Sequence, residues 1–65
     1  MNVVEKLETM AKKAIELDHV FLGVCYLTIA YFVKMGLISE EVGEVCRHDP
    51  KRFYDEIQNR RITAT

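Results

Sequence analysis

The sequence predicts an all-α fold: a small helical bundle in which a helical hairpin is followed by two short C-terminal helices. Apolar residues recur at helical spacing along much of the chain. A single proline and three glycines leave few points at which a helix must break. Helix-capping residues stand where the apolar pattern restarts. With 65 residues, the chain is expected to form one domain over residues 1–65.

A first helix is predicted from about Asn2 to Leu17. Its inner face repeats at alternating spacings of four and three residues: Val3, Leu7, Met10, Ala14 and Leu17. Asp18 then interrupts the apolar pattern and is a candidate N-cap for a second helix. Since neither Gly nor Pro forces a break there, one continuous helix through residue 35 is the alternative.

The second segment, residues 20–35, contains the almost wholly apolar run VFLGVCYLTIAYFV. A helix that is hydrophobic on every side must be buried on every side. The neighbouring helices of so short a chain cannot enclose it, so a second copy is expected to complete the core. We therefore predict a homodimer. Its predicted interface consists of Phe21, Val24, Tyr26, Leu27, Tyr31 and Phe32.

A membrane span is the rival explanation of this segment. The run has 14 residues and would be about 21 Å long as a helix, against a hydrocarbon core of roughly 30 Å. The opening MNVVEKLE is acidic and lacks the basic start and apolar run of a secretion signal. Cys25 and Cys46 are interpreted as reduced, buried residues. These features favour a cytoplasmic protein over a membrane-bound one.

Two further helices are predicted after Gly36, which is a C-terminal stop because glycine adopts the left-handed conformation cheaply. Ser39 is the predicted N-cap of the third helix, whose inner face is expected to contain Val42, Val45 and Cys46. Asp49-Pro50 marks the start of the last helix, predicted to run to about Arg61. Its predicted inward-facing residues are Phe53, Tyr54 and Ile57, and residues 62–65 are expected to form a frayed tail.

No pattern in the sequence indicates an enzyme or a cofactor site. There is no nucleotide-binding glycine loop, nucleophile elbow or zinc-protease helix motif. Cys46, His48 and Asp49 lie close together, but zinc sites typically show paired C-x-x-C or H-x-x-x-H spacing. We therefore predict no catalytic residues, no metal and no cofactor.

The C-terminal part carries one suggestive motif. In residues 38–64, a helix capped by Ser39 and containing a small residue, Gly43, is followed by a short turn. The second helix opens with Asp49-Pro50 and continues with the basic and aromatic residues KRFY. This segment resembles the helix-turn-helix of excisionase and MerR-type DNA-binding proteins. The resemblance implies DNA binding through residues 39–61, with the dimer setting the half-site spacing.

On this resemblance, Lys51, Arg52 and Arg60 would contact the duplex. Asp55 and Glu56 argue against it, because they stand four residues after Lys51 and Arg52 and would repel phosphates. A net charge of -1 adds no general attraction to nucleic acid.

The leading functional prediction is a small regulatory adaptor or inhibitor that binds another, unidentified protein as a homodimer. It follows from the absence of enzyme and cofactor motifs, and from the exposed surface that the last two helices are expected to offer to a partner. The residues expected to bind the partner are Arg47, Lys51, Arg52, Tyr54, Arg60 and Arg61. The alternative is the helix-turn-helix DNA-binding regulator.

Overall fold

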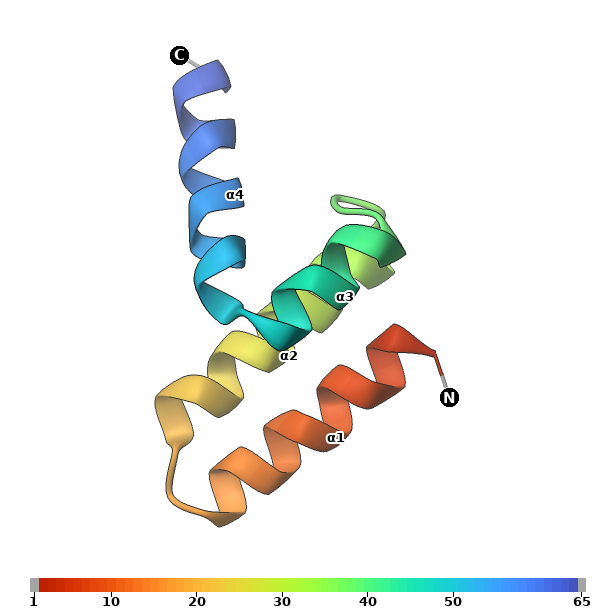
Figure 1. Cartoon of the computed structure of the whole chain (residues 1–65), viewed down its shortest axis with the longest axis vertical. Coiled ribbons are helices and arrows are strands. Elements are labelled where there is room, and N and C mark those ends of the chain that lie inside the picture. The colour runs from red at the N-terminus through yellow and green to blue at the C-terminus, as the bar shows by residue number, and fades with distance from the viewer. Residues whose placement is uncertain (1, 65) are drawn as a thin grey trace.

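Four helices make up the part of the chain that the computed structural model describes, namely the backbone of residues 2–64 and the side chains of residues 2–59. They are α1 (Val3–Glu16), α2 (Val20–Lys34), α3 (Glu40–His48) and α4 (Pro50–Ala64). Figure 1 shows α1 and α2 as an antiparallel hairpin, with α3 packed on it and α4 leaving at a steep angle. The predicted all-α fold, a hairpin followed by further helices, is confirmed.

The first two helices are separate, and the chain turns at residues 17–19. Asp18 has a left-handed backbone, with φ of 68°. Its amide donates to the Ile15 carbonyl at 3.0 Å, and the His19 amide donates to the Ala14 carbonyl at 2.8 Å. This pair of hydrogen bonds is the Schellman motif that ends many helices. The continuous helix through residue 35 is therefore wrong, and the N-cap of α2 is His19 rather than Asp18.

The turn between α2 and α3 has the predicted signals. Gly36 has φ of 74°, and its amide donates to the Val33 carbonyl at 3.1 Å. The Leu37 amide donates to the Phe32 carbonyl at 2.9 Å, which completes a second Schellman motif. Ser39 then caps α3, since its hydroxyl oxygen accepts from the Val42 amide at 3.1 Å.

Asp49 alone joins α3 to α4. Pro50 begins α4 as predicted, because its fixed φ suits the first helical position and it has no amide to leave unpaired. The helix continues to Ala64, past the predicted end at Arg61, so residues 62–64 belong to α4 rather than to a tail. Thr65 lies outside the described residues.

The core lies where α1, α2 and α3 meet, with Leu7, Ile29 and Cys46 fully buried. Phe53 joins α4 to this core through an edge-to-face contact with Phe32, at 5.0 Å between ring centroids. Three residues expected on inner faces are instead exposed: Leu17, Val45 and Tyr54. Leu17 follows the last residue of α1, while Val45 and Tyr54 each neighbour a buried residue, and consecutive helical positions point about 100° apart.

Two glycines allow close packing of the helices. A Cβ atom at Gly23 of α2 would lie 2.5 Å from Ile15 Cγ1 on α1, and one at Gly43 of α3 would lie 2.6 Å from Val33 Cγ2 on α2. The absence of a side chain at Gly23 therefore lets α1 and α2 approach closely in the hairpin.

Candidate functional site

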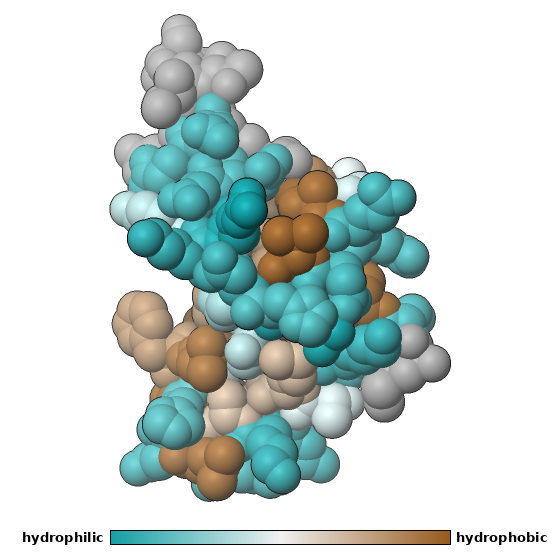
Figure 2. All heavy atoms as spheres, in the orientation of Figure 1, coloured by the Kyte–Doolittle hydropathy of each residue, from teal (hydrophilic) through white to brown (hydrophobic). Residues whose placement is uncertain are grey.

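A row of exposed apolar side chains runs along α2, on the face that α1 and α3 leave uncovered. We call this row the α2 stripe. It consists of Val20, Phe21, Val24, Leu27, Tyr31 and Met35, all exposed. Figure 2 shows apolar side chains at the lower left, over the start of α2 and the α1–α2 turn. Soluble monomers rarely leave so long a contiguous apolar surface in water.

Helical geometry explains why these residues share a face. Positions 20, 24, 27, 31 and 35 follow spacings of three and four residues, which place side chains above one another on a helix. Phe21 lies beside this row, and its side chain is 93% exposed. The opposite face, which includes Tyr26, Ile29 and Ala30, is buried against α1 and α3.

Thr28, beside the stripe, needs no hydrogen-bond partner from another chain. Its hydroxyl, on the same flank of α2 as Phe21, donates to the Val24 carbonyl at 2.8 Å. Its hydrogen-bonding requirement is therefore met within the helix. Beside the stripe, Lys34 Nζ is 3.0 Å from Glu8 Oε2. The apolar surface could thus be covered without stranding the Thr28 hydroxyl.

The structure divides the six residues predicted for the oligomer interface. Phe21, Val24, Leu27 and Tyr31 lie on the stripe. Tyr26 is only 9% exposed and belongs to the core of its own chain. Phe32 is partly buried against Phe53.

Val20 and Met35 were missed. The three-and-four spacing places both on one face with Val24, Leu27 and Tyr31, but the sequence alone does not mark this face of α2 as the exposed one.

The residues predicted to bind a partner are also divided. Lys51, Arg52 and Tyr54 are exposed at the start of α4. Arg47 is occupied within its own chain, because its guanidinium pairs with Glu44 and its Nη1 lies 3.6 Å from the sulfur of Met10. The predicted Arg60 and Arg61 have side chains outside the described residues.

Glu44 organises the charged groups at the end of α3. Its Oε1 accepts from Arg47 Nε at 3.1 Å and lies 3.2 Å from His48 Nε2. The hydrogen bond from Arg47 lowers the pKa of the Glu44 carboxyl, and the same bond raises the pKa of Arg47. This cluster fixes the last turn of α3 by charge complementarity.

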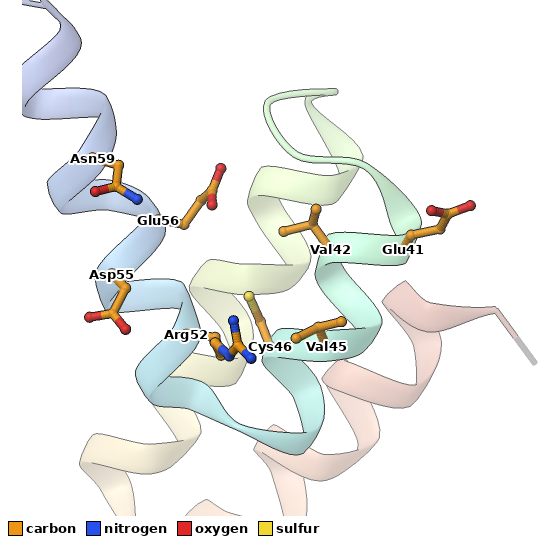
Figure 3. Close-up of a pocket in the computed structure, with 8 residues that line it drawn as sticks. All are labelled: Glu41, Val42, Val45, Cys46, Arg52, Asp55, Glu56 and Asn59. Carbon is orange, nitrogen blue, oxygen red and sulfur yellow. The ribbon is translucent and has the colours of Figure 1, made fainter.

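A groove of about 540 Å³ separates α3 from α4. Figure 3 shows Arg52 and Glu56 extending from α4 towards α3, with Val42, Val45 and Cys46 on the other wall. Since its lining mixes a cation, carboxylates and apolar groups, the groove is a weaker binding surface than the α2 stripe. A second, shallower hollow of about 300 Å³ lies between Met10 on α1 and Leu22 on α2.

The two cysteines are free and protected to different degrees. Cys46 is 1% exposed and Cys25 is half-buried. Burial raises the pKa of both thiols, which keeps them protonated and slows their reaction with electrophiles. Across the described residues, no group of three or more His, Cys, Asp or Glu side chains is arranged to hold a metal ion.

Within the described residues, none of the helices combines the length and the apolar character needed to cross a bilayer. Comparison with family models, curated proteins and solved structures gave no match to this chain.

Proposed function

We propose that this protein is a small non-enzymatic protein-binding module, a regulatory adaptor or inhibitor, that works as a homodimer. The observation that carries the proposal is the α2 stripe. It is apolar apart from the Tyr31 hydroxyl, the neighbouring Thr28 hydroxyl is satisfied, and it lies on a helix whose opposite face anchors the core. Association that covers such a surface with a second apolar surface is favourable, because it removes apolar area from water.

The predicted partner-binding residues lie away from the stripe. Lys51, Arg52 and Tyr54 are at the start of α4, which contacts α2 through Phe32 rather than through the stripe. A dimer built on α2 would therefore present two copies of this region, and two linked sites bind a partner more tightly than one. This division of surfaces supports an adaptor role.

Light scattering coupled to size-exclusion chromatography at micromolar concentration tests the dimer. The expected mass is twice the 7.6 kDa of one chain. Val24→Asp should give a folded monomer, because it would bury two charges in the interface, one from each copy. Val45→Asp is the matched control, since Val24 is 52% exposed and Val45, on α3, is 49% exposed. A monomeric wild type, or equal effects of the two substitutions, would refute the proposal.

The adaptor role is tested separately in the native cell. A tagged chain, cross-linked and purified, should recover a second protein, and the replacement of Lys51, Arg52 and Tyr54 by alanine should reduce its yield. Recovery of the chain alone, with the dimer intact, would remove the adaptor role and leave only self-association.

DNA binding through α3 and α4 is the second candidate. The observation in its favour is that Lys51 and Arg52 are exposed together at the N-terminal end of α4, where phosphates bind readily. Against it, Asp49 alone links the helices, whereas the helix-turn-helix uses a turn of about three to four residues. Salt-dependent binding to a duplex that weakens when Lys51 and Arg52 become alanine would favour this candidate.

A further inference from the structure

We propose that the two copies pack α2 against α2 in antiparallel orientation, about a two-fold axis that crosses the stripe near Leu27. The inference rests on the proposed homodimer and specifies how its second copy sits on the stripe. In a two-fold dimer both chains use the same surface, so the stripe must fit itself. The sizes of its side chains decide which orientation fits, and the area that it offers shows that a second copy can cover it.

Side-chain size changes along the centre of the stripe. The N-terminal half carries the short side chains of Val20 and Val24, and the C-terminal half carries the longer side chains of Tyr31 and Met35. Leu27 stands between the two halves. An antiparallel pair places the short half of one copy against the long half of the other. A parallel pair would place valine against valine and tyrosine against tyrosine, leaving a gap at one end and crowding at the other, and packed interfaces tolerate neither.

Phe21 fits the same orientation, although it lies in the N-terminal half. Helical spacing puts Phe21, Thr28 and Phe32 on one flank of α2 rather than on its centre line. In the antiparallel pair, the exposed ring of Phe21 faces the C-terminal part of the partner's flank, where Phe32 is only partly buried. Aromatic rings favour such neighbours in edge-to-face or offset contacts.

The dipoles of the two α2 helices are opposed in the antiparallel pair and aligned in the parallel pair, which favours the antiparallel orientation. Lys34, the last residue of α2, forms a salt bridge with Glu8 of its own chain at 3.0 Å, so its charge does not choose between the orientations.

The exposed area is sufficient for a second copy. An aromatic side chain offers roughly 150–250 Å², and Phe21 and Tyr31 are 93% and 56% exposed. Together they supply roughly a quarter to a half of the ~800 Å² that each partner contributes to a standard interface. Val20, Val24, Leu27 and Met35 add exposed apolar area along the same face. A second stripe of equal length and hydrophobicity is the occupant that this surface matches.

Cysteine cross-linking tests the orientation. The background is Cys25→Ala, with the buried Cys46 retained. Val20→Cys and Met35→Cys lie at opposite ends of the stripe, about 22 Å apart along the helix. Chains carrying the two substitutions, distinguished by a tag, are refolded together and treated with a short bis-maleimide. Val45→Cys, on α3, is the matched exposed control.

The antiparallel dimer should give a covalent heterodimer of Val20→Cys with Met35→Cys as the main product. Each variant alone, and each mixed with Val45→Cys, should give little product. Strong self-linking of Val20→Cys and of Met35→Cys, without the heterodimer, would overturn the orientation while leaving the homodimer standing. A chain that is monomeric by light scattering in every sample would overturn both, and would mean that something other than a second copy covers the stripe.

Discussion

Replacement of Phe21 by alanine separates association from folding. The side chain is 93% exposed in the single chain, so nearly all of its burial energy remains available to a dimer. Burial of a phenylalanine side chain contributes about 1.5–3 kcal/mol. A two-fold interface contains it twice, which gives about 3–6 kcal/mol, or an increase in the dimer dissociation constant of roughly 10²–10⁴-fold. Folding of the monomer should change by less than about 0.5 kcal/mol, as for most surface substitutions.

The dissociation constant is measured by sedimentation equilibrium over a concentration series. Monomer stability is measured by urea unfolding in the Val24→Asp background, where association does not contribute to the midpoint. Tyr54→Ala is the control, because Tyr54 is 63% exposed but lies on α4. If Phe21→Ala changed dissociation no more than Tyr54→Ala does, or destabilised the monomer by more than about 1 kcal/mol, the argument for the stripe would be wrong.

Four further predictions concern the two helix ends, the charged cluster and the thiols. Asp18→Gly should stabilise the chain by about 0.5 kcal/mol, a rise in melting temperature of about 2–4 °C, because glycine adopts the left-handed φ without strain; an unchanged or lower midpoint would contradict the strain argument. Gly36→Ala should cost about 1 kcal/mol for the same reason, and since nothing lies within 4 Å of the added Cβ the loss would be purely conformational, so Gly36→Asn should lose less. The lowered pKa of Glu44 means that its stabilising contribution is present above the ordinary value of 4.5 and is lost as pH falls through the folded value; Glu44→Gln should therefore flatten the acid side of the stability curve, and parallel curves would refute the coupling. A thiol reagent should modify Cys25 in the folded protein and Cys46 only as urea opens the core, so equal rates without urea would contradict the burial of Cys46.

Local signals in the sequence were sufficient to locate most helix ends. Ser39 and Pro50 act through their own neighbouring amides and dihedral angles, and Gly36 through its freedom to adopt positive φ. Asp18 shows the limit of this reasoning. Its side chain is typical of an N-cap, but its backbone has the left-handed conformation that ends α1, for which glycine is the usual residue. The turn at Asp18 brings Gly23 of α2 against Ile15 of α1, a contact that exists only in the folded hairpin.

Inward and outward positions on the C-terminal helices were harder to predict. Val45 and Tyr54 are apolar or aromatic residues beside buried neighbours, and periodicity over a helix as short as the nine residues of α3 leaves the width of its buried face undetermined. Tertiary contacts decide both cases, because Cys46 and Phe53 are the buried neighbours. Phe53 packs on Phe32 of α2, a contact between residues far apart in the sequence.

By itself, the sequence determined that this protein is helical, where most of its helices begin and end, and that α2 carries more apolar surface than one short chain can cover. These properties depend on hydrogen bonds and side-chain spacing within a few residues. Only the tertiary structure decided which face of α2 the chain buries for itself. It placed Tyr26 in the core and left Val20 and Met35 in solvent, because a helix that is apolar all round has no sequence period to mark its inner face, and only the positions of α1 and α3 define one.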